Sequence, residues 1–117
     1  DAPCTGLGTV QRRPEILLRT GPGDPARLGD LQRAILRNAA SLTRPGGRVV
    51  YAVCSPMREE GLDVVQPLIS QGLLPFEDGR FEADEDGLVR IGPWLDDCDA
   101  YQVAVLAAGR KISSDGV

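Results

Sequence analysis

One run of residues constrains the fold of this chain more than any other. The run Arg48–Val53 is apolar after its first residue and rich in β-branched side chains, which is typical of a buried strand in a parallel sheet. It follows the turn sequence Arg44-Pro45-Gly46-Gly47 and leads directly into Cys54. The sequence therefore predicts a buried strand with a cysteine at its carboxyl end.

A second cysteine lies near the start of the chain. Asp1-Ala2-Pro3-Cys4 is followed by Thr5-Gly6-Leu7-Gly8-Thr9, whose glycines permit a sharply turning backbone. If this segment follows a strand parallel to Arg48–Val53, the crossover between them brings both cysteines to the carboxyl edge of the sheet, where open α/β sheets bind ligands. A cysteine that ends a strand is also typical of a small buried apolar residue, so this alternative stays open for Cys4 and Cys54.

The segment between the two cysteines predicts one long helix. Residues 10–23 contain several helix breakers and are expected to be irregular, with a helical turn or two at 14–18. Asp24 followed by Pro25 predicts a helix start with a side-chain cap, and Pro45-Gly46-Gly47 predicts its end. Gln32, Arg33 and Arg37 lie on the expected polar face, and the expected apolar stripe comprises Leu28, Leu31, Ile35, Ala39 and Leu42.

A second helix is expected directly after Cys54. Ser55 and Pro56 repeat the cap-then-proline pattern, and the helix is expected to reach about Gln71, with Pro67 bending or shortening it. A cysteine just before a helix amino terminus experiences its partial positive charge, which favours the thiolate. The pattern therefore marks Cys54 as a candidate nucleophile.

The last part of the chain predicts short strands and an acidic loop. Residues 72–76 are expected to form a short strand, and residues 77–87 a solvated acidic loop or hairpin, because they lack the full spacing of a calcium loop. Residues 100–108 form an apolar run that predicts a final central strand. The tail from Arg110 is expected to fray.

Composition narrows the class of protein. The 117 residues fit one domain, contain no apolar stretch of membrane-spanning length and no signal-peptide pattern, so a cytoplasmic setting is expected. Three cysteines without paired spacing, and no histidine, favour free thiols and no metal site. Cys98, outside both motifs, is expected to be structural or incidental.

Charge is distributed unevenly along the chain. The net charge is -4, yet residues 1–58 carry nine arginines against four acidic residues, whereas the remainder carries four basic residues against thirteen acidic ones. The basic half suits contact with an RNA phosphate backbone, and Arg12, Arg13 and Arg33 are the candidate RNA-binding residues. An arginine-rich but merely solvated helix face is the alternative for each of them.

Two motifs resemble a known family. Asp-Ala-Pro-Cys-Thr-Gly-Leu-Gly-Thr, then Arg12-Arg13-Pro14-Glu15 and Leu31-Gln32, and finally Arg44–Ser55 with its cysteine, resemble the C-terminal half of the Sun (Fmu) type ribosomal RNA cytosine-C5 methyltransferases. The resemblance is dense up to about Glu60. Ala52-Val53 stand where the family usually has hydroxyl residues, and Ala100 stands where it usually has glycine.

The resemblance implies a fold, a reaction and roles for residues. The implied fold is α/β, the C-terminal portion of a Rossmann-like methyltransferase sheet, with about three strands and the last one antiparallel. The implied reaction transfers a methyl group from S-adenosyl-L-methionine to C5 of a cytosine in rRNA. Cys54 is the implied nucleophile, Cys4 assists product release, and Asp1 bonds the base edge, with Asp1, Ala2 and Pro3 also lining the cofactor site.

Several alternatives remain open beside this resemblance. DNA cytosine-C5 methyltransferases use the cysteine of the first motif as nucleophile, which would be Cys4 here. The family's cofactor-binding half would precede residue 1, so residues 1–117 are expected to be a fragment that is inactive alone, needs the upstream half and is able to form a homodimer through an exposed strand edge. A non-catalytic RNA- or protein-binding α/β module, and methylation of uracil or an amino group, are the competing functions.

Overall fold

A computed structural model describes residues 1–75, 82–95 and 97–108. Phe76, residues 77–81 of the expected acidic loop, Asp96 and the expected frayed tail lie outside the described residues. The helices are α1 (Ile16–Arg19), α2 (Asp24–Leu42) and α3 (Leu62–Ser70), with short 3-10 turns η1 (Leu7–Thr9) and η2 (Arg58–Glu60). The strands are β1 (Arg48–Val53), β2 (Leu73–Pro75), β3 (Val89–Ile91) and β4 (Tyr101–Ala108).

Strand β4 is the centre of the sheet. It pairs antiparallel with β1, β2 and β3, and its pairing with β1 extends from Val53↔Gln102 to Arg48↔Ala107. The predictions of a strand over 48–53, a short strand within 72–76 and an antiparallel final strand are therefore confirmed. Strand β3 was not predicted, because three residues beside glycine and charged side chains carry no period of their own.

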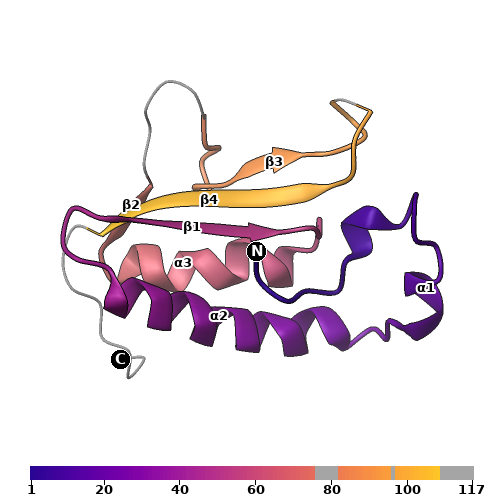
Figure 1. Cartoon of the computed structure of the whole chain (residues 1–117), viewed down its shortest axis with the longest axis horizontal. Helices are drawn as coiled ribbons and strands as arrows, with labels where there is room; N and C mark the ends of the chain where they lie inside the picture. Colours follow the sequence, from indigo (N-terminus) through magenta and orange to yellow (C-terminus); the bar gives the residue numbers. More distant parts are fainter. Residues whose placement is uncertain (76–81, 96, 109–117) are drawn as a thin grey trace.

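Both long helices cover the same face of the sheet (Figure 1). Because side chains alternate along a strand, the β1–β4 register separates two faces. On one face, Val49, Tyr51 and Val53 oppose Leu106, Ala104 and Gln102, and all six are buried beneath α2 and α3. On the other face Val50 is 59% exposed, so the sheet has one covered and one open side.

The buried face of α2 differs from the predicted stripe. The buried residues of α2 are Pro25, Gly29, Gln32, Leu36 and Ala40. Leu31, Ile35 and Leu42 of the predicted stripe are exposed, and Gln32, assigned to the polar face, is fully buried. The predicted stripe was wrong because Gln32 is buried with its amide hydrogen-bonded, whereas several apolar side chains of α2 face solvent. Helical periodicity alone does not reveal such a hydrogen-bonded polar residue in the core.

The start of the second helix also differs from its prediction. The expected helix at Ser55-Pro56 is absent: the segment forms the turn η2, and α3 begins only at Leu62. The Ser55 hydroxyl accepts from the Met57 N–H at 3.2 Å, a local turn in place of a helix cap. No α-helix amino terminus therefore follows Cys54 directly, and the helix-dipole argument for its thiolate is removed.

Candidate functional site

The two predicted cysteines meet at the end of β1. Cys4 Sγ and Cys54 Sγ lie 3.4 Å apart, although 50 positions separate them in the sequence. Both are half-buried free thiols, and either sulfur can donate the weak hydrogen bond between them. The predicted proximity of the two cysteines is confirmed, whereas residues 1–4 form no strand parallel to β1.

Main-chain hydrogen bonds attach the first motif to β1 and β4. The N–H of Ala2 donates to the Ala52 carbonyl at 3.0 Å, and that of Gly8 donates to the Cys54 carbonyl at 2.9 Å. The Gly8 carbonyl in turn accepts from the Ala100 N–H at 2.9 Å. A Cβ at position 8 would lie 2.0 Å from the Ala100 carbonyl oxygen, so glycine is required for this close approach.

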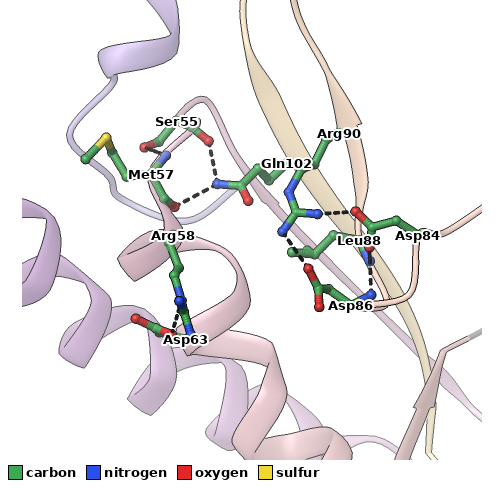
Figure 2. Close-up of polar contacts among 9 residues, drawn as sticks. All are labelled: Ser55, Met57, Arg58, Asp63, Asp84, Asp86, Leu88, Arg90 and Gln102. Carbon is green, nitrogen blue, oxygen red and sulfur yellow. Dashed lines mark hydrogen bonds and ion pairs between the residues drawn. The ribbon is translucent and has the colours of Figure 1, made fainter.

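The segment after Cys54 is held from β4 by one side chain (Figure 2). Gln102 Nε2 donates to the carbonyl oxygens of Ser55 at 2.7 Å and Met57 at 2.9 Å. A Cβ at Gly61 would lie 2.0 Å from Gln102 Oε1, so this glycine leaves room for the amide. The backbone that follows the candidate nucleophile is thus fixed by the central strand.

A buried carboxylate that sequence reasoning missed joins the two motifs. Glu60 is fully buried and accepts from the N–H and Oγ1 of Thr5, each at 2.8 Å, from Gln32 Nε2 at 3.1 Å, and from Ser55 Oγ. Periodicity could not reveal it, because a glutamate near an expected helix start reads as a solvated residue. The only available signal was its position five residues after the second motif, at the limit of the dense resemblance.

Burial raises the pKa of two side chains at the site, Cys4 and Tyr51. Desolvation, followed by the hydrogen bond and charge of Cys54, raises the pKa of Cys4 to about 11. Burial and then the nearby Glu60 charge raise the pKa of Tyr51, whose hydroxyl donates to the Glu60 carbonyl at 2.6 Å. Cys4 therefore remains a protonated thiol at neutral pH in the resting site.

The predicted cofactor residues lie along the edge of β1 that does not pair with β4. Asp1 and Pro3 are exposed and Ala2 is half-buried. Together with Ile35 and Val50 they help to line a cavity of about 150 Å³ between α2 and β1. This volume is below the usual size of a small-molecule site.

The three predicted RNA-binding arginines have different environments. Arg12 pairs with Asp99, which raises the Arg12 pKa, and the exposed Arg13 pairs with Glu15 at 3.4 Å. Arg33 pairs with Asp30 and belongs to the α2–α3 contact. A cavity of about 510 Å³ is lined by Gln11, Arg12, Ile91, Asp97, Cys98, Asp99 and Tyr101.

Acidic groups of the second half bind arginine. Arg90 pairs with Asp84 and Asp86, and Asp84 also accepts from the Leu88 N–H (Figure 2). Within residues 1–75, 82–95 and 97–108, no group of three or more acidic or cysteine side chains could hold a metal ion. In the same ranges, no helix is long and apolar enough to cross a membrane.

Comparison with known families now decides the class of protein. The family described as 16S rRNA methyltransferase RsmB/F matches residues 1–106. The chain belongs to this family. Its two cysteine motifs lie within the matched region, in agreement with the resemblance seen in the sequence.

Relatives and solved structures agree with this assignment. A putative methyltransferase of Mycobacterium tuberculosis is 55% identical over 113 residues, 91% of this chain and 25% of its own length. Ribosomal RNA small subunit methyltransferase B of Thermus thermophilus is 46% identical over 71 residues, 61% of this chain and 18% of its own length. NSun6 from Pyrococcus horikoshii with SFG superposes with a TM-score of 0.80 at 27% identity, over 94% of this chain and 29% of the other.

The family assignment has consequences for fold and extent. The structural neighbours confirm the expected fold class, an α/β portion of a Rossmann-like RNA methyltransferase sheet. The chain spans about a quarter of the length of the Mycobacterium tuberculosis relative.

Proposed function

We propose that the longer protein containing this chain methylates C5 of a cytosine in rRNA with S-adenosyl-L-methionine, through a covalent adduct between Cys54 and C6 of the base. The observation that carries this proposal is the 3.4 Å separation of Cys4 Sγ and Cys54 Sγ at the end of β1. The RsmB/F family membership supplies the rRNA methyltransferase class. SFG, the S-adenosylmethionine analogue held by the Pyrococcus NSun6, supports the choice of methyl donor.

Cytosine chemistry explains why two thiols are useful. C5 is a poor nucleophile until a thiolate adds at C6, which forms an S–C6 bond and concentrates electron density at C5. C5 then takes the methyl group, and the donor's sulfur–methyl bond breaks. Loss of the C5 proton to a base and cleavage of the S–C6 bond restore the aromatic ring. We assign addition to Cys54 and proton removal to Cys4.

The pKa of Cys4 supports this order of events. In the resting site, the hydrogen bond and charge of Cys54 contribute to its pKa of about 11. Once Cys54 is bonded to C6, it no longer carries a negative charge. This removes one cause of the raised Cys4 pKa, whereas burial, the larger cause, remains, so a larger fraction of Cys4 loses its own proton to solvent and is then able to accept the C5 proton.

Asp1, Ala2 and Pro3 are proposed to face both the base and the cofactor. The Ala2–Ala52 hydrogen bond holds this segment at the carboxyl end of β1, next to Cys4. The exposed Asp1 carboxylate is able to accept from the N4 amino group of cytosine. The cofactor would supply the electrophilic methyl group, with most of its pocket formed by the upstream half.

The upstream half is proposed to pack along the edge of β1 that does not pair with β4. The Ala2–Ala52 contact places the start of the chain alongside β1, and Val50 and Ile35 are exposed next to it. The Mycobacterium tuberculosis relative is about four times as long, and the residues beyond the matched part would cover this edge. A homodimer through the same edge is the alternative occupant for the isolated chain.

The RNA is proposed to approach from the side of Arg12 and Arg13. Both are exposed, and Arg12 and Tyr101 line the larger cavity next to the Ala100–Gly8 contact. An aromatic ring beside a guanidinium is suited to a nucleotide that flanks the target base. Arg33 is included with this surface only through its partly exposed guanidinium.

Covalent trapping tests the proposal. The full-length protein is incubated with cofactor and rRNA, and adducts are resolved on a denaturing gel. Cys54→Ala should abolish the adduct, Cys4→Ala should let it accumulate, and Cys98→Ala should behave as wild type. The reverse pattern for Cys4 and Cys54 would assign attack to Cys4. RNA binding without an adduct or methyl transfer in any variant would favour the non-catalytic binding module.

A further inference from the structure

The four donors that surround Glu60 are neutral and come from three separate segments. The Thr5 N–H and Gln32 Nε2 bond Oε1, whereas Thr5 Oγ1 and Ser55 Oγ bond Oε2. A carboxylate offers about four acceptor positions and no donor when ionised. These four donors therefore fill the acceptor positions of the fully buried Glu60 side chain.

The donors are adjacent to the reactive cysteines in the chain. Thr5 directly follows Cys4, and Ser55 directly follows Cys54. Glu60 thus binds the residue after each thiol with the two oxygens of a single carboxylate. In this arrangement the sulfur atoms of Cys4 and Cys54 lie 3.4 Å apart.

Gln32 links Glu60 to Pro3, the residue that precedes Cys4. Its Nε2 donates to the Pro3 carbonyl at 2.8 Å and to Glu60 at 3.1 Å. Cys4 is therefore held through the residue before it and the residue after it. The hydroxyl of Tyr51 fixes the Glu60 backbone at 2.6 Å, so the carboxylate is attached to β1 as well.

We propose that Glu60 is the positioning residue that sets the distance between Cys4 and Cys54, so that both sulfurs reach one cytosine ring in the same bound state. Glu60 does not touch the substrate and acts through Thr5 and Ser55. This inference rests on the proposed two-cysteine function. Its consequence is that loss of the carboxylate separates the thiols and slows chemistry without weakening RNA binding.

The test measures thiol geometry and chemistry separately in the full-length protein. The equilibrium between the Cys4–Cys54 disulfide and a glutathione redox buffer gives the effective concentration of one thiol at the other, in a Cys98→Ala background. Single-turnover methyl transfer and the Kd for rRNA are measured in the same variants. Glu60→Gln retains side-chain length and removes the charge, and Glu59→Gln is the matched control on the same turn.

The expected result is specific to position 60. Glu60→Gln should lower both the effective concentration of the thiols and the single-turnover rate at least tenfold, with the RNA Kd changed less than threefold. Glu59→Gln should change none of the three. A folded Glu60→Gln protein with unchanged thiol pairing would overturn the proposal, whether or not its methyl transfer is slower.

A second pair of variants decides the matter if Glu60→Gln does not fold. Thr5→Val keeps the side-chain shape and loses the Oγ1 donor, whereas Thr5→Ser keeps the donor. Weaker thiol pairing in Thr5→Val than in Thr5→Ser supports the proposal, and equal pairing overturns it. Because thiol pairing requires no RNA, its outcome is separate from the Cys54→Ala adduct test, which alone decides the proposed function.

Discussion

Arg33 Nη1 donates to the carbonyl oxygen of Asp63 at 3.1 Å, which joins α2 to α3. Pro67 lies four residues after Asp63 within α3, and proline has no N–H to donate to that carbonyl. The guanidinium therefore replaces the helical hydrogen bond that Pro67 removes. A residue expected from its charge to bind RNA has a structural contact of its own.

The Arg33 contact predicts a loss of stability. Arg33→Met retains much of the apolar stem and removes the donor, so the free energy of unfolding should fall by about 1–2 kcal/mol. Arg27→Met, which removes an exposed ion pair with Asp24, should change it by no more than about 0.5 kcal/mol. Urea denaturation of the full-length protein measures both. Equal unfolding with a selective loss of RNA affinity in Arg33→Met would instead assign Arg33 to RNA.

The close approach of Gly61 to Gln102 predicts that a methyl group added at position 61 lowers the stability of the fold strongly. A Cβ at position 61 would displace the Gln102 amide and break its bonds to Ser55 and Met57. Gly61→Ala should therefore lower the free energy of unfolding by roughly 2–4 kcal/mol. Gly23→Ala is the control, because nothing lies within 4 Å of its added Cβ. Similar unfolding midpoints for the two variants would contradict the packing described for Gln102.

The raised pKa of Cys4 predicts its reactivity. With a pKa of about 11 against an ordinary value of 9.0, the thiolate fraction of Cys4 at pH 8 should be about 100-fold below that of an unperturbed cysteine. Alkylation by iodoacetamide should be correspondingly slow and rise up to about pH 11. Cys54→Ala should shift this rise to lower pH, because it removes the hydrogen bond and charge of Cys54. Peptide mass spectrometry separates the cysteines, and an inflection near pH 9 in the wild type would contradict the burial argument.

Arg13 provides a prediction about RNA affinity. Its ion pair with Glu15, 3.4 Å between Nε and Oε1, is exposed to solvent and therefore weak. The Arg13 guanidinium is thus able to leave Glu15 and bind an RNA phosphate. Arg13→Ala should weaken rRNA binding and reduce the slope of log K against log salt by about 0.7. Arg90→Ala, whose side chain is engaged by Asp84 and Asp86, should leave the slope unchanged. Filter binding at several salt concentrations compares the two, and identical slopes would remove Arg13 from the RNA surface.

Much of the fold was predictable from local patterns. The apolar run Arg48–Val53 and the apolar run that contains β4 lie between clear breakers, and both become strands as predicted. The helix from Asp24 was also predicted, although its Oδ2 accepts from the Gly21 N–H and does not cap the helix. Breakers and run lengths determine such elements locally, so one sequence is enough to find them.

The contacts that shape the site were not predictable in the same way. Glu60 and Gln32 are polar residues whose burial depends on donors from distant segments, and local patterns assign them to solvent. Ser55 carried a helix-cap signal, but its hydroxyl binds Glu60 and the Met57 N–H. Tertiary hydrogen bonds overrode the local preference at each of these positions.

The chain of bonds from Ala100 through Gly8 to Cys54 consists of main-chain atoms alone. So does the bond from Ala2 to Ala52, one of the positions where hydroxyl side chains were expected from the resemblance. Every residue except proline carries both the N–H and the carbonyl group, so these hydrogen bonds do not depend on which side chains stand at 52 and 100. Position 8, by contrast, admits no side chain at all.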